Sequence, residues 1–325
     1  MAHEIDLSNG RENFAFVGDT AWHGLGVKLE PNMPLEHWAV QAGMNWKLES
    51  SPVYYGTPEL PKTFPDRKAY FRSDNGAPLA VVSNDHREVH PGEVLEFFRE
   101  LTEGAGFELE TAGCLFGGRK FWAMAKVGKG VKIMNQDEIR PYLLLGSSCD
   151  GSMATSAQFT SVRVVCSNTL RMAIGAHGEK AAVRVPHMAK WDPEDAKEKL
   201  GLKSEDAWEN FIGNINKLAK FKIHRGDAID VVAKELKDEW LTEGDERLSE
   251  STPLALIIKL FDGSGLGADL KSSKGTGWGL LNAVTEYADH HTAARSAEKR
   301  FERANFTNQA SFKTSVANKL LVLAS

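Results

Sequence analysis

The residues best suited to chemistry lie between positions 142 and 174, where a thiol, a carboxylate and a guanidinium group occur close together. Two apolar or alternating runs, 142–146 and 158–165, are separated by an Asp-Gly turn, which predicts two antiparallel strands. Asn168 is a good N-cap, so the pattern predicts a helix that begins directly after Cys166. Free backbone N–H groups at such a strand-to-helix junction favour anions.

Cysteine, histidine and aspartate side chains give the first catalytic candidates. Cys166 beside a helix N-terminus could act as a nucleophile, with His23 or His290 as its base and Asp150 at the same junction. The favoured interpretation is a small buried thiol that ends a strand, because no Cys/His signature surrounds it. His23 is kept as a candidate, although the Trp-His-Gly-Leu-Gly sequence around it is more typical of a packed N-terminal strap.

A second polar cluster is predicted on the helix 278–291, where Asn282, Glu286, Asp289 and His290 share one face. Glu286 and His290 lie one turn apart with Asp289 beside them, which makes them weak candidates for a divalent-metal site. A structural polar network is favoured, because the His-Glu-x-x-His arrangement is absent. No motif implies a cofactor, since P-loop and dinucleotide signatures are missing as well.

Basic side chains concentrate in two segments, 163–190 and 211–226, which contain few acids. Positive charges interleaved with aromatic residues suit a groove for single-stranded nucleic acid, because charges follow the phosphates while rings stack on bases. The alternative is a solvated surface neutralised by the acids of residues 192–209. The predicted nucleic-acid-binding residues are Arg163, Arg171, Arg184, Lys217, Lys220, Lys222 and Arg225.

Composition limits the class of protein. The chain has 325 residues, 42% of them hydrophobic, a net charge of -5 and three cysteines. We expect a soluble cytoplasmic protein with no disulfide framework and no membrane partner, since neither a signal peptide nor an apolar run of about 18 residues occurs. The negative net charge argues against a protein that coats nucleic acid with a basic surface on all sides. It does not exclude a local basic groove.

The elements that must position these residues change character along the chain. Hairpin signals without alternating βα units predict an α+β fold, whose first domain, residues 1–190, is an antiparallel hairpin-rich sheet with packed helices. Residues 191–325 are predicted to be mostly helical, with the helix 278–294 packing back on the sheet. The Gly/Ser-rich segment 262–277 is predicted to be a mobile loop.

Several motifs in one order resemble a known family. They are AWHGLG (21–26), FRSDNG (71–76), SSCDGS (147–152), VRVVCSNTL (162–170) and GTGWGLLNAVTEYADH (275–290). The chain is similar to the phage/plasmid-like protein family, a domain-of-unknown-function group of bacteriophages, prophages and plasmids. Many relatives have Ser-His-Asp-Gly-Ser where this chain has cysteine at 149, so a general role for histidine there is not implied. The resemblance implies mobile-element biology and carries no established activity.

Three functions follow as hypotheses. The preferred one is a non-catalytic protein that binds single-stranded DNA in recombination or annealing, because a β-rich platform with basic patches is similar in architecture to phage annealing recombinases. The first alternative is an enzyme whose site lies between the junction 150–168 and the helix face 282–290, under the loop 262–277. The second is a protein that binds a host factor through an exposed apolar patch. The patterns favour a non-enzymatic role and leave a homo-oligomer open.

Overall fold

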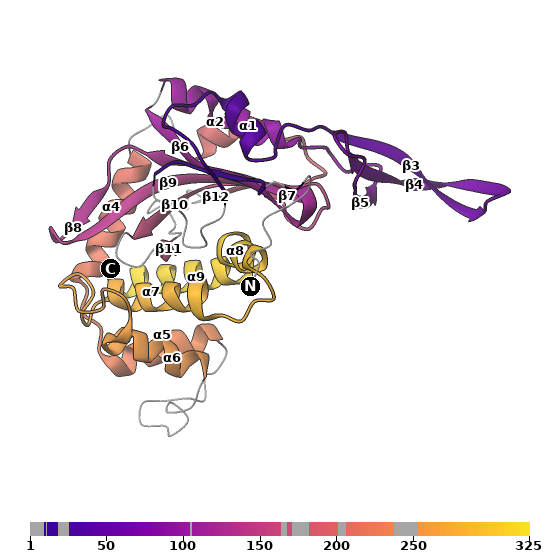
Figure 1. Cartoon of the computed structure of the whole chain (residues 1–325). Coiled ribbons are helices and arrows are strands. Elements are labelled where there is room, and N and C mark those ends of the chain that lie inside the picture. Colours follow the sequence, from indigo (N-terminus) through magenta and orange to yellow (C-terminus); the bar gives the residue numbers. More distant parts are fainter. Residues whose placement is uncertain are drawn as a thin grey trace.

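A central antiparallel sheet organises the molecule, as the α+β prediction requires (Figure 1). The computed structural model describes residues 10, 12–18, 26–104, 106–163, 168–170, 182–200, 206–236 and 252–325. In spatial order the strands are β11 (Asn168–Leu170), β10 (Thr155–Arg163), β9 (Asp137–Ser148), β7 (Lys120–Val127), β6 (Phe107–Leu115), β1 (Phe14–Phe16) and β2 (Val27–Lys28). Further pairings add β12 (Ala182–Val185) to β10 and β8 (Val131–Ile133) to β9. Only β1 and β2 pair in parallel among these strands.

One face of the sheet is covered by α1 (Leu35–Gln41) and α2 (Pro91–Gly104), which lie above it in Figure 1. Ala123, Leu145 and Ala157 are direct cross-strand neighbours and fully buried, so they form a flat apolar layer. The α2 side chains Phe97 and Phe98 belong to the same core. Small residues in the strands therefore allow α2 to pack closely across β6 and β7.

The opposite face is covered by α8 (Ala297–Phe306), a helix that the sequence patterns did not indicate. The rings of Phe301 and Trp122 lie 4.6 Å apart, and Gln158 Nε2 donates to the carbonyl of Asn305. Gly146 is required here, because a Cβ atom at this position would lie 2.6 Å from the ring of Phe306. The helix is therefore fastened by both aromatic packing and polar bonds.

The other described helices are α3 (Pro193–Lys199), α4 (Asp206–Lys220), α5 (Arg225–Leu236), α6 (Pro253–Lys259), α7 (Gly277–Glu286) and α9 (Asn308–Leu323). α3 lies beside α2, since Lys197 pairs with Glu100 at 2.8 Å. α4 lies at the side of the sheet, and α5, α6, α7 and α9 lie below it in Figure 1. The apolar α7 packs against α4 and α9, while α5 packs against α6 and α9. α6 and α7 each continue into a π-helical turn, at 260–264 and 287–291.

A separate three-stranded sheet projects from the body as an arm (Figure 1). It contains β3 (Leu48–Thr57), β4 (Leu60–Arg72) and β5 (Pro78–Ser83). The sequence predicted the 68–72/79–82 hairpin, but it did not predict that β4 begins at residue 60. Prolines at 58, 61 and 65 conceal this extension, because proline is usually excluded from strand interiors.

The predicted helix after Cys166 is wrong where the structure describes it. Residues 168–170 form strand β11, which pairs antiparallel with 161–163 of β10. The backbone groups of Asn168 are thus engaged in strand pairing at the outer edge of β10. Tertiary pairing overrides the capping preference of asparagine at this position.

Close packing at the start of α7 gives a first prediction. A Cβ atom at Gly279 would lie 1.9 Å from the carbonyl oxygen of Ser273, so we expect Gly279→Ala to destabilise the protein by about 3 kcal/mol or more. Gly213 in α4 has open space around its Cβ position, and Gly213→Ala should stabilise the protein by up to about 1 kcal/mol. Urea unfolding curves measure both; equal stabilities for the two variants would contradict this packing.

Candidate functional site

The basic residues at the end of α4 lie beside a second basic segment. Residues 221–223 pair with residues 275–277: Ile223 N donates to the carbonyl of Gly275, and Gly277 N donates to that of Phe221. Lys222 forms a β-bridge with Thr276, and its ammonium group donates to the carbonyl of Lys274 at 3.3 Å. This pairing brings two stretches of chain, about 50 residues apart, to one surface.

The resulting lysine cluster consists of Lys217, Lys220, Lys222, Lys271 and Lys274. All five side chains are exposed, and none has an ion-pair partner within the part of the chain that the structure describes. The half-buried ring of Phe221 lies in the same turn. Lys222 directly contacts the backbone of Lys274, and the Lys217 ammonium group donates to Ser325 Oγ at 2.9 Å. Exposed ammonium groups without carboxylate partners attract a polyanion.

The other predicted basic residues differ in their surroundings. Arg225 is exposed but paired with Asp262 at 3.0 Å, so its charge is neutralised. Arg163 ends β10 opposite Ile139, and Ile139 pairs with β8, the strand on which α4 packs. The backbone of Arg163 therefore lies at the same end of the sheet as α4.

Arg184 lies at the opposite end of β10. It pairs with Ser156, seven strand positions before Arg163, which corresponds to about 23 Å. The predicted groove for single-stranded nucleic acid therefore does not extend as one surface to Arg184. The positions Cys166, His23 and Arg171 lie outside the described residues, as does the side chain of Arg163.

The metal candidates on the helix after Trp278 bind other groups. Glu286 accepts a hydrogen bond from the amide of Leu266 and lies 3.8 Å from His291 Nε2. Asp289 forms an ion pair with Lys313 of α9 at 2.6 Å. Among the described residues there is no group of three or more ligating side chains that could hold a metal ion.

The π-helical turn explains why the predicted face is changed. In a π turn the backbone hydrogen bonds run from i to i+5 instead of i to i+4, and here Glu286 meets His291 instead of His290. The backbone carbonyl of His290 accepts from Arg300. The segment predicted to be a mobile loop is tied to the body, since Ser272 Oγ donates to the carboxylate of Asp137, which also accepts from Trp278 Nε1.

Asp150 lies in the turn between β9 and β10. Its carboxylate accepts two hydrogen bonds from Ser152; burial alone would raise the pKa of Asp150, but those bonds and the charge of Lys120 hold it below its usual value. Cys149 is buried, and burial raises the pKa of its thiol to about 12. Asp150 follows the end of β9 that adjoins the start of β10, whereas Arg163 ends β10. The structure therefore does not bring Asp150 and Arg163 together as the enzyme hypothesis requires.

Two buried histidines meet at this turn, and no sequence pattern indicated them. The rings of His86 and His187 stack with centroids 4.5 Å apart, and a third ring, Tyr70, packs edge-on against His86. His187 Nε2 lies 2.6 Å from the carbonyl of Met153, whereas His86 Nε2 and His187 Nδ1 have no partner among the described groups. His86 follows β5 of the arm and His187 follows β12 of the main sheet, so the stack joins the two sheets.

The histidine stack should make stability depend on pH. Burial, then the charges of His187 and Lys68, lowers the pKa of His86 from 6.5 to about 4. The unfolded chain therefore binds a proton below pH 6.5 that the folded protein refuses until about pH 4. We expect the free energy of unfolding to fall by on the order of 2 kcal/mol as the pH is lowered from 6.5 to about 4. Urea unfolding at several pH values tests this, and His86→Phe should flatten the dependence; an unchanged curve would refute it.

A further pair of titratable side chains lies on the face of the sheet away from α2. Tyr142 Oη donates to the carboxylate of Glu110 at 2.8 Å. Burial raises the pKa of Glu110, and burial also raises that of Tyr142. Glu110 lies at the β-bulge of β6, opposite no residue of β7, which directs its side chain out of the regular alternation.

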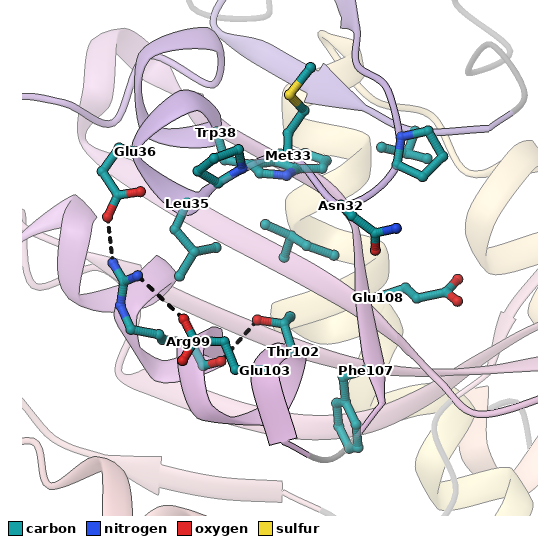
Figure 2. A pocket seen from close by; sticks show the side chains of 14 residues that line it. Asn32, Met33, Leu35, Glu36, Trp38, Arg99, Thr102, Glu103, Phe107 and Glu108 are labelled. Carbon is teal, nitrogen blue, oxygen red and sulfur yellow. Dashed lines mark hydrogen bonds and ion pairs between the residues drawn. The ribbon is translucent and has the colours of Figure 1, made fainter.

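A hollow of about 500 Å³ opens between α1, α2 and β6 (Figure 2). Its size is within the range of small-ligand sites. Its apolar lining includes Met33, Leu35, Trp38 and Phe107. The rim is acidic, with glutamates at 36, 103 and 108, and Arg99 bridges the first two. None of the residues predicted from the sequence lines this hollow.

Comparison with known proteins gives a family and no activity. The family model described as "Domain of unknown function (DUF932)" matches residues 78–309, a range that contains the lysine cluster and most of the main sheet. No curated protein and no solved structure matches the chain. Among the described helices, none combines the length and apolar character needed to cross a membrane.

Proposed function

We propose, for a chain that belongs to the DUF932 family of unknown function, that it binds single-stranded nucleic acid through the lysine cluster. The observation that carries this proposal is the pairing of residues 221–223 with 275–277, which assembles five exposed ammonium groups from two segments. A cytoplasmic role in phage or plasmid strand annealing or recombination belongs to the same proposal.

Electrostatics supports this assignment over a general affinity for anions of any size. The chain carries a net charge of -5, so its overall field repels a polyanion, and the lysine cluster supplies a local attraction. Several ammonium groups in a row match the repeated phosphates of a flexible strand, and each contact releases a counterion. A single strand can adapt its flexible backbone to the positions of these lysines, and its bases remain accessible for stacking.

Fluorescence anisotropy with labelled oligonucleotides tests the proposal. We expect binding to a single-stranded 30-mer that exceeds binding to the corresponding duplex. Neutralisation of Lys217, Lys220 and Lys222 to glutamine should weaken this binding by about tenfold or more. The matched control neutralises the exposed lysines at 28, 47 and 234, which preserves net charge relative to the test variant and should retain affinity. Equal losses in both triple variants, or no binding by the wild type, would overturn the proposal.

A further inference from the structure

The distal part of the arm has no partner in its own chain. We call residues 52–67 the arm tip; it projects from the body as a two-stranded ribbon (Figure 1). The side chains Tyr54, Tyr55, Leu60 and Phe64 are 62%, 53%, 67% and 41% exposed. A ribbon of two strands is marginally stable in water, and large apolar residues at its end indicate that a second surface covers it.

The strand register places three of these four apolar residues on one face, whereas Tyr54, which pairs with Thr63, lies on the other face. Tyr55 pairs with Lys62, and Thr57 pairs with Leu60. Because side chains alternate between faces, Tyr55, Leu60, Lys62 and Phe64 share one face, on which the rings of Tyr55 and Phe64 lie 5.8 Å apart. This face presents three apolar side chains and a single cation.

Prolines make the edges of the arm tip poor templates for strand addition. Prolines occupy positions 52, 58, 61 and 65, where each removes a backbone N–H group. A partner must therefore contact the face rather than extend the sheet. The charges of the arm tip balance, with Glu59 and Asp66 against Lys62 and Arg67, so it lacks the positive excess that phosphates require. These features favour a protein surface as the occupant.

The hollow between α1, α2 and β6 has the complementary character. Its apolar lining suits Tyr55, Leu60 and Phe64, and its acidic rim suits Lys62 (Figure 2). Glu103 and Glu36 are similarly exposed, at 67% and 70%, but Glu103 lies 3.7 Å from Arg99 whereas Glu36 lies at 2.7 Å, so Glu103 is held less closely by that guanidinium group. The arm points away from the body and from α1 and α2, so the arm tip does not reach the hollow of its own chain (Figure 1).

We propose that the arm tip of one copy docks, through its Tyr55–Leu60–Phe64 face, into the hollow between α1, α2 and β6 of a second copy. The two surfaces are different, so this contact is heterologous and builds a ring or an open chain of subunits. It is independent of the lysine cluster, which lies on other elements.

Sedimentation velocity over a range of protein concentrations tests this contact. The wild type should associate, and the triple variant Tyr55→Ser, Leu60→Ser, Phe64→Ser should be monomeric. Val81→Ser is the matched control, because Val81 is 60% exposed on β5 of the same sheet but outside the arm tip; it should associate as the wild type does. A monomeric wild type, or association that the triple variant retains, would overturn the proposal.

A charge exchange identifies the second surface. Lys62→Glu should weaken association at least tenfold, and the double variant Lys62→Glu, Glu103→Lys should restore it. These exposed positions leave the core unchanged, so the result does not depend on the folding of the triple variant. If Lys62→Glu weakens association and Glu103→Lys fails to restore it, the arm binds elsewhere and the assignment of the hollow is wrong.

Discussion

Replacement of Asp289 by alanine should lower the free energy of unfolding by about 3–5 kcal/mol. Asp289 and Lys313 form an ion pair at 2.6 Å between the π-helical turn and α9, and the Lys313 side chain has no exposed surface. Removal of the carboxylate leaves an ammonium group in the interior without this counter-charge. Burial of an uncompensated charge costs far more than the pair itself contributes.

Two control variants separate this effect from the loss of any ion pair. Glu235→Ala removes the partner of Lys319 in a partly exposed pair and should cost less than about 1 kcal/mol. The double variant Asp289→Leu, Lys313→Met removes both charges and should recover most of the stability lost. Urea unfolding followed by circular dichroism measures all three; an Asp289→Ala variant within 1 kcal/mol of the wild type would contradict the account.

Reversal of Lys271 and Lys274 to glutamate should reduce affinity for single-stranded DNA by about a hundredfold. These two residues were absent from the set predicted from the sequence, and only the pairing of residues 275–277 with 221–223 places them beside α4. Reversal removes two attractive groups and introduces two repulsive ones on the same surface.

The measurement is an anisotropy titration at one fixed ionic strength. The control is Lys28→Glu, Lys47→Glu, which changes the net charge equally on another part of the protein. If both double variants lose affinity to the same extent, overall charge and not the lysine cluster determines binding.

The sequence predicted most local elements but not their long-range partners. The hairpin of β6 and β7 follows from alternation around Phe-Gly-Gly, and α2 follows from Pro91 and the helical spacing of its apolar residues. The extension of β4 could not be predicted, because two prolines, at 61 and 65, lie in it. The π-helical turn at 287–291 was equally hidden, since helical periodicity assumes a repeat of 3.6 residues.

The sequence could predict the lysines of the candidate site that form a local pattern, but not the residues that only long-range pairing brings to it. Lys217, Lys220 and Lys222 form a local pattern on one helix and its end, so composition shows them. Lys271 and Lys274 lie in a Gly/Ser-rich segment that indicates a loop, and only tertiary pairing brings them to the surface of α4. His86 and His187 are isolated in the sequence, 101 positions apart, and their contact depends on how the arm meets the sheet.

The most direct test of nucleic-acid binding is the salt dependence of the association constant. For the wild type, a plot of log K against log salt concentration should be steep, with the five lysines contributing a slope of about 3.5 in magnitude on a single strand. Substitution of all five by glutamine should remove that contribution. Equal slopes for wild type and variant would contradict the account.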